Sequence, residues 1–202
     1  MAHLAAYGPA VDRTNPSAVS TAADVADAVA ARAAELSADV YELIVREIPQ
    51  LGTDRGVLAV VEASVAENVA TVLHVLQHGM DVTQVHAPAA ARENARRLAQ
   101  RGIPMAALLR SYRLGLTRFQ DWFLREIGER VRDATMVSET GLRVTGITGR
   151  YIDQVAEEVV SVYETEKHNW QRSRPWARTR SRGPPAPRPG PPRASPTSHR
   201  SP

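Results

Sequence analysis

Apolar residues recur every three or four positions along most of this chain, the spacing that places them on one face of an α-helix. Five segments follow this spacing: residues 21–48, 55–78, 87–100, a segment that opens at Ile103-Pro104, and 134–168. No alternating strand pattern of useful length interrupts them. The pattern predicts an all-α domain, either a bundle of about five helices or a globin-like packing, with a long C-terminal helix.

Residues that commonly start or stop helices stand at the predicted boundaries. Ser20 or Thr21 is positioned to cap the first helix. Pro49 is expected to end that helix, because proline disfavours helical geometry in the residue before it. Asp54 is positioned to cap the second helix, and glycines suited to helix C-termini follow the second and third helices at positions 79 and 102.

The last two helices carry the most distinctive apolar stripes. The fourth helix holds both phenylalanines of the chain, Phe119 and Phe123, so the centre of the core is expected there. In the fifth helix, four aliphatic residues follow spacings of three, four and three, which is the a/d pattern of a coiled coil. These residues form the predicted seam of a homodimer: Ile152, Val155, Val159 and Val162.

The two ends of the chain lack this periodicity. Residues 1–19 mix glycine, proline, asparagine and serine, and we expect a flexible leader there. Residues 171–202 contain 9 of the 14 prolines and few aliphatic side chains. Such a segment cannot bury a core and is expected to be a disordered Arg/Pro-rich tail. The helical sensor or regulatory domain is therefore expected to span residues 20–170.

The net charge of +3 combines an acidic domain with a basic tail. Eight of the 25 basic residues follow residue 170, whereas all 22 acidic residues precede residue 167, so residues 1–170 carry a net charge of −5. An acidic domain argues against direct DNA binding by the folded part. The tail leaves an alternative function open, that of a nucleic-acid- or acidic-surface-associated protein acting through non-specific charge contacts.

The sequence contains no cysteine, which excludes disulfides, thiolate metal sites and cysteine nucleophiles. No run approaches the ~18 consecutive apolar residues of a membrane span. The N-terminus has no basic start followed by an apolar block, as a secretory signal would have. We therefore expect a cytoplasmic protein that has no membrane partner.

Few side chains stand in patterns that suggest chemistry. His74 and His78 have a spacing of four, which can present two imidazoles to one metal ion, and Glu67 precedes them by two turns. All three lie on the face away from the apolar stripe, which favours a solvated surface over a metal site. No catalytic motif and no phosphate-binding glycine loop is present, so we predict neither enzymatic activity nor a cofactor, haem included.

Tyr112 and Arg113 in the fourth helix are the candidate ligand-binding residues. Arg113 lies between Leu109 and Leu116, so its guanidinium is expected to be partly buried and to need a partner. Two interpretations remain open. Arg113 grips an anionic ligand or a carboxylate of a protein partner, or it pairs internally with an acidic residue such as one of the fifth helix.

Residues 101–123 carry a pattern that resembles the RsbRD N-terminal domain family. The pattern is a glycine, a hydrophobic residue and a proline, then two leucines, and then an aromatic-Arg-hydrophobic-Gly tetrad. It is formed by Gly102, Ile103, Pro104, Leu108, Leu109, Tyr112, Arg113, Leu114 and Gly115. The preceding helix, with Asn68, and the last helix are also similar to the family, so the resemblance covers about residues 40–168. The family often has a histidine after the tetrad, where this chain has Leu116.

The resemblance implies an N-terminal sensor or regulatory module. Such modules head anti-anti-sigma factors with a STAS domain and PucR/CdaR-type transcriptional regulators. Neither output domain is recognisable after residue 170, and Arg/Pro-rich sequence is what a GC-rich gene gives in a wrong reading frame. The leading hypothesis is therefore a truncated member, the sensor or dimerisation domain of a bacterial transcriptional or stress-signalling regulator without its output domain. A second copy of the chain, another protein and an unidentified small molecule are the expected partners.

Overall fold

The computed structural model of the protein describes residues 16–173, which form six α-helices and two short 3-10 turns without a β-strand in that range. The predicted all-α class with a long C-terminal helix is confirmed. The helices are α1 (Pro16–Ala30), α2 (Ala33–Glu47), α3 (Arg55–His78), α4 (Ala89–Arg101), α5 (Met105–Arg130) and α6 (Ala134–Ser173), and the turns are η2 (Pro49–Leu51) and η3 (Val82–Gln84).

Most of the predicted leader, and all but the first residues of the predicted tail, lie outside the described residues. Within them, α1 already begins at Pro16 and α6 reaches Ser173. The helical region is therefore a few residues longer at both ends than the predicted domain of residues 20–170.

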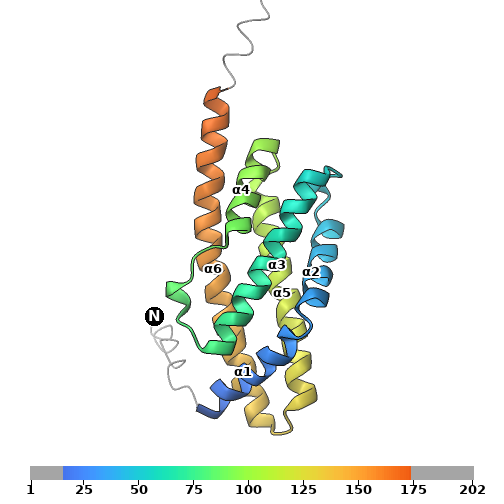
Figure 1. Ribbon diagram of the computed structural model, residues 1–202, viewed down its shortest axis with the longest axis vertical. Coiled ribbons are helices and arrows are strands. Elements are labelled where there is room, and N and C mark those ends of the chain that lie inside the picture. The colour runs from blue at the N-terminus through green and yellow to red at the C-terminus, as the bar shows by residue number, and fades with distance from the viewer. Residues whose placement is uncertain (1–15, 174–202) are drawn as a thin grey trace, which may run out of the picture.

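Five helices form a closed ring around a shared core. Helix α3 packs on α4, α4 on α6, α6 on α5, α5 on α2, and α2 again on α3. Helix α1 lies across one end of this ring, against α3, α5 and α6 (Figure 1). The two phenylalanines of α5 pack with their ring centroids 5.5 Å apart, and Phe123 is fully buried. The prediction that the fourth apolar stripe centres the core is therefore confirmed.

The predicted first helix, residues 21–48, is two helices. The chain turns at residues 31 and 32, and Arg32 has φ −118° and ψ 21°, outside helical geometry. No glycine or proline marks this turn. It arises because α1 packs on α3, α5 and α6, whereas α2 fits between α3 and α5. The predicted caps also lie inside α1, where the Ser20 and Thr21 hydroxyls donate to the carbonyl of Ser17.

The other predicted boundaries are confirmed. The Asp54 carboxylate accepts hydrogen bonds from the amides of Gly56 and Val57, at 2.8 and 3.3 Å, and so caps α3. Gly79 and Gly102 end α3 and α4 with φ of 62° and 69°, a left-handed conformation that costs glycine little. Pro49 follows the last turn of α2 and opens η2.

Helix α6 is the longest element, with 40 residues. It continues without a break through Gly141, Gly146 and Gly149, runs along α4 and α5, and extends beyond the end of α4 (Figure 1). Nearly every side chain of residues 164–172 is exposed. One helix thus joins the interior of the ring to a projecting, solvated end.

Against the expectation of no membrane span, α3 is long and apolar enough to cross a membrane by length and composition alone, the one such helix in residues 16–173. It is also a central helix of the bundle, with nine buried residues that include Val61, Val69 and Leu76. Buried core helices pass the same test, so this is weak evidence for a membrane segment.

Candidate functional site

The ring of helices contains a partly open cavity of about 60 Å³. Its walls come from α2, α3, α4, α5 and α6 and include buried aliphatic side chains such as Val61, Val65 and Ile44. None of the described side chains that line it carries a charge. The polar residues among them are Ser64, Asn68, Asn94, Ser111, Tyr112, Thr148 and Tyr151.

Several of these polar groups are held by hydrogen bonds within the wall. Tyr151 Oη of α6 donates to Asn68 Oδ1 of α3 over 2.9 Å, and Asn68 Nδ2 donates to the carbonyl of Ser64 over 2.7 Å. Thr148 Oγ1 accepts from Gln120 Nε2 at 3.0 Å and donates to the carbonyl of Val144. These bonds tie α6 to α3 on one side of the cavity and to α5 on the other.

Two polar atoms of the lining have no such partner. Four buried side-chain N or O atoms in residues 16–173 make no hydrogen bond, and two of the four are Tyr112 Oη and Asn94 Oδ1. Both residues are buried, with exposed fractions of 8 % and 3 %. Because an unpaired buried polar group costs about 1–3 kcal/mol, their presence beside empty space suggests a partner that enters the cavity.

The Tyr112 phenol remains a neutral donor at physiological pH. Burial raises the pKa of Tyr112 to about 12, and weak hydrogen-bonding interactions with the side chains of Ser64 and Asn68, which fall outside normal hydrogen-bond geometry, offset only part of that rise. Burial raises the pKa of Tyr151 as well. The cavity therefore presents uncharged hydroxyl and amide groups.

The structure separates the two residues of the predicted ligand pair. Tyr112 lines the cavity, but Arg113 is exposed and has no ion-pair partner in the described part of the chain. The prediction of a partly buried Arg113 is wrong, because successive side chains of a helix point in different directions. With Tyr112 turned inward, Arg113 faces solvent, so the internal-pair interpretation is not supported, and binding to an anionic ligand or a partner's carboxylate stays a prediction.

Asn94 is one of the lining residues that sequence reasoning missed. Its segment, residues 89–101, is rich in arginine, so its composition alone does not indicate a buried position. A helical signal was nevertheless present, since Ala91, Ala95 and Leu98 share the face that includes Asn94, and all are buried. Small apolar neighbours at helical spacing therefore marked Asn94 as an inward-facing residue.

The predicted dimer seam faces the interior of the chain. Val155 and Val159 have no exposed surface, while Ile152 and Val162 are partly buried against the core. Ile152 also lines the cavity. The coiled-coil spacing of these four residues thus serves packing within the bundle, and in this structure the two valines are not available to a second copy.

His74 and His78 lie on the surface of α3. Their ring centroids are 4.1 Å apart, and both side chains are exposed. Glu67 does not join them, because its carboxylate accepts a hydrogen bond from the amide of Ala90 over 2.8 Å at the start of α4. In the described span, no three His, Asp or Glu side chains gather in a way that could hold a metal ion.

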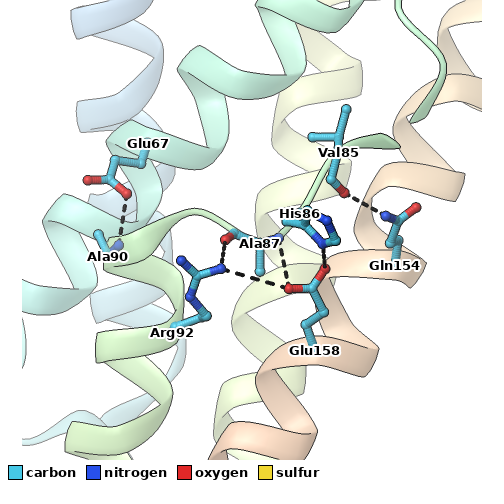
Figure 2. A network of polar contacts seen from close by, with 8 residues as sticks. All are labelled: Glu67, Val85, His86, Ala87, Ala90, Arg92, Gln154 and Glu158. Atoms are coloured by element: carbon cyan, nitrogen blue, oxygen red, sulfur yellow. Dashed lines mark hydrogen bonds and ion pairs between the residues drawn. The ribbon is translucent and has the colours of Figure 1, made fainter. Parts of the chain in front are cut away.

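Hydrogen bonds and ion pairs hold the α3–α4 connection on α6, as Figure 2 shows. We call this network the clasp, and its residues are Val85, His86, Ala87, Arg92, Gln154 and Glu158. Gln154 Nε2 donates to the carbonyl of Val85 over 2.6 Å. The Glu158 carboxylate accepts from the amide of Ala87 at 3.2 Å and lies 3.1 Å from His86 Nδ1. Arg92 Nη1 donates to the Ala87 carbonyl over 2.7 Å and lies 4.0 Å from Glu158. Sequence reasoning did not single out these contacts, which join residues about 70 positions apart.

A model of the family described as the RsbT co-antagonist protein RsbRD N-terminal domain matches residues 34–178. The match spans α2 to α6 and therefore includes every helix that lines the cavity. No curated protein and no solved structure matches the chain significantly, so the globin-like packing stays a prediction.

Proposed function

Since the chain belongs to the family of RsbRD N-terminal domains, which makes it a domain of the stress-signalling regulator type, we propose that it works as the sensor of such a regulator. In this proposal the domain acts as a homodimer in the cytoplasm. A change at the internal cavity alters the position of α6, and α6 passes that change to a transcriptional or stress-signalling output.

The continuity of α6 is the observation that carries this proposal. Thr148, Tyr151 and Ile152 line the cavity, and the same unbroken helix runs on to Ser173. At a rise of ~1.5 Å per residue, the end of α6 lies about 33 Å from Tyr151. A rigid helix that touches the cavity and projects from the bundle is suited to carry a small displacement over that distance.

Three contacts along α6 connect it to the rest of the ring. Tyr151 binds α3 through Asn68, and the clasp of Gln154 and Glu158 holds the α3–α4 connection. Further along, Tyr163 Oη donates to the carbonyl of Ile103 over 2.7 Å. A shift of α6 must alter these contacts, which supports α6 as the element that changes between two states of the sensor.

Two exposed leucines support dimerisation. Leu142 of α6 and Leu124 of α5 have exposed fractions of 71 % and 47 %. The Leu124 side chain lies against Gly141, the residue before Leu142, so both leucines stand where α5 and α6 pack together. An exposed apolar surface is typical of protein interaction sites, and we place the dimer contact here instead of along the buried valines of α6.

The experiment that tests the sensor role is genetic. In the organism of origin, the gene for this chain is deleted and then restored, and stress-response transcripts are measured after heat and osmotic shock. We expect the deletion to change the level or the timing of these transcripts and the restored gene to reverse the change. Identical transcript responses in the deleted, restored and parental strains would refute the proposed function.

A further inference from the structure

We propose that the cavity binds a small, uncharged aliphatic molecule with one group that both donates and accepts a hydrogen bond, such as the hydroxyl of a short-chain alcohol. The inference deepens the sensor role proposed above by naming the chemical class of its ligand. It rests on that role only for its biological meaning, since the binding itself follows from the cavity.

The size of the cavity limits the ligand. About 60 Å³ is available, and roughly 10–15 Å³ of space measured in this way holds one water molecule. The space therefore suits a single molecule of about four non-hydrogen atoms. Larger cofactors and nucleotides are excluded.

The charge of the lining limits the ligand further. No side chain that lines the cavity carries a charge, and most of the wall surface is apolar. An ion placed there would lose its hydration without gaining an opposite charge, which is strongly unfavourable. The ligand is therefore neutral, with an apolar body that replaces water against Val61, Val65 and Phe119.

The two unpartnered atoms define the polar end of the ligand. Tyr112 Oη carries a hydrogen to donate, and Asn94 Oδ1 accepts one, while neither atom makes a hydrogen bond of normal geometry in residues 16–173. The other hydroxyls of the lining are already bonded, for example Tyr151 to Asn68 and Ser111 to the carbonyl of Leu108. A hydroxyl fits what is left, because its oxygen accepts from Tyr112 and its hydrogen is donated to Asn94.

Gly115 provides a way to close the cavity without disturbing the fold. It lines the cavity on α5, and a Cβ atom added there would lie 3.5 Å from Val40 Cγ1, an ordinary contact. Alanine at this position therefore takes up cavity space without a clash. Gly128 on the same helix is exposed, with open space around an added Cβ, and Gly128→Ala is the matched control.

The binding test uses the full chain labelled with ¹³C at its Val, Leu and Ile methyl groups. It is titrated with 1-propanol and, separately, with propylammonium and propionate, charged molecules of similar size. We expect saturable methyl shifts at Val61, Val65 and Ile152 with 1-propanol only. The dissociation constant should lie at about 0.1–10 mM, given the limited affinity available to so few atoms.

The variants decide whether the cavity is the binding site. Gly115→Ala should weaken 1-propanol binding at least tenfold, and Gly128→Ala should leave it unchanged. Tyr112→Phe, which removes the hydroxyl and keeps the ring, should weaken binding several-fold and serves as the second variant if Gly115→Ala does not fold. Non-saturable shifts, equal binding of a charged probe, or full binding by both cavity variants would overturn the proposal.

The two proposals fail separately. The titration is made on the purified chain, and the transcript experiment is made in cells. If 1-propanol does not bind but the deletion strain loses its stress response, the ligand class is wrong and the sensor role stands. If binding is found but the transcripts do not change, the cavity is a binding site and the proposed function is wrong.

Discussion

Tyr112 and Tyr163 are both buried, but their hydroxyl groups differ in hydrogen bonding. Tyr163 Oη donates to the carbonyl of Ile103, whereas Tyr112 Oη makes no hydrogen bond of normal geometry among the described residues. Loss of the Tyr163 hydroxyl leaves a buried carbonyl unpaired, whereas loss of the Tyr112 hydroxyl removes a buried polar group that lacks a hydrogen bond. We expect Tyr163→Phe to lower the free energy of unfolding by about 1–2 kcal/mol, and Tyr112→Phe to leave it unchanged or raise it by up to about 1 kcal/mol. Urea unfolding measures both, and equal losses in the two variants would contradict this assignment.

Burial of Tyr112 also predicts a loss of stability in alkaline solution. Its pKa in the folded protein is raised from 10.0 to about 12. A raised folded pKa means that the stabilisation is complete below about pH 10 and is lost as the pH rises from about 10 to 12. The difference corresponds to roughly 3 kcal/mol. Urea midpoints between pH 8 and 11.5 should therefore fall less for Tyr112→Phe than for the wild type, with Tyr151 causing part of the remaining fall. Parallel curves for the two proteins would rule out this role of Tyr112.

At the residue scale, the sequence pattern placed some cavity residues and not others. Tyr112 shares an apolar stripe with Phe119 and Phe123, so its inward position follows from helical spacing alone. The expected partial burial of Arg113 is wrong, because leucines at positions 109 and 116 do not show which way the side chain at position 113 points. The pairing of Tyr151 with Asn68 spans 83 positions and depends on how α3 and α6 meet, which helical periodicity does not encode.

At the element scale, Glu158 and its neighbour Glu157 allow a matched test of the clasp. Glu158 accepts from the Ala87 amide and pairs with His86, whereas Glu157 is exposed on the adjacent position of α6. We expect Glu158→Ala to speed hydrogen exchange at the Ala87 amide about tenfold and to lower the free energy of unfolding by about 1 kcal/mol. Glu157→Ala should change neither quantity. Exchange measured by NMR checks this, and unchanged protection of Ala87 in Glu158→Ala would show that the clasp does not hold the connection.

Helix boundaries were predictable where a side chain or a backbone conformation sets them locally. Asp54 satisfies the first amides of α3, and Gly79 and Gly102 supply the left-handed residue that ends a helix. The turn at Arg32 has no such local cause. Its alanine-rich surroundings continue a helix equally well, and only the different neighbours of α1 and α2 require the break.

At the scale of the whole molecule, the closed ring explains why the α6 stripe was assigned to a dimer. A spacing of three and four residues shows that a helix buries one face, but it does not show whether the neighbour belongs to the same chain. Here α4 and α5 of the same chain lie against α6, and Val155 and Val159 are fully buried. The same closure creates the cavity, because five helices that meet around one centre leave space beside a glycine such as Gly115.

The oligomeric state is the prediction that concerns the molecule as a whole. With the α6 stripe used internally, the exposed leucines Leu124 and Leu142 are the surface that we expect a second copy to cover. Leu142→Glu places a charge in that contact and should convert the dimer to a monomer in size-exclusion chromatography with light scattering, because a buried unpaired charge is strongly unfavourable. Trp170→Glu is the matched control, since Trp170 is 43 % exposed but lies about 42 Å along α6 from Leu142. A wild-type protein that stays monomeric at high concentration would contradict dimerisation itself. If Trp170→Glu breaks the dimer and Leu142→Glu does not, the dimer contact lies at the projecting end of α6 instead. The two copies would then meet on the same helix that lines the cavity and transmits the change.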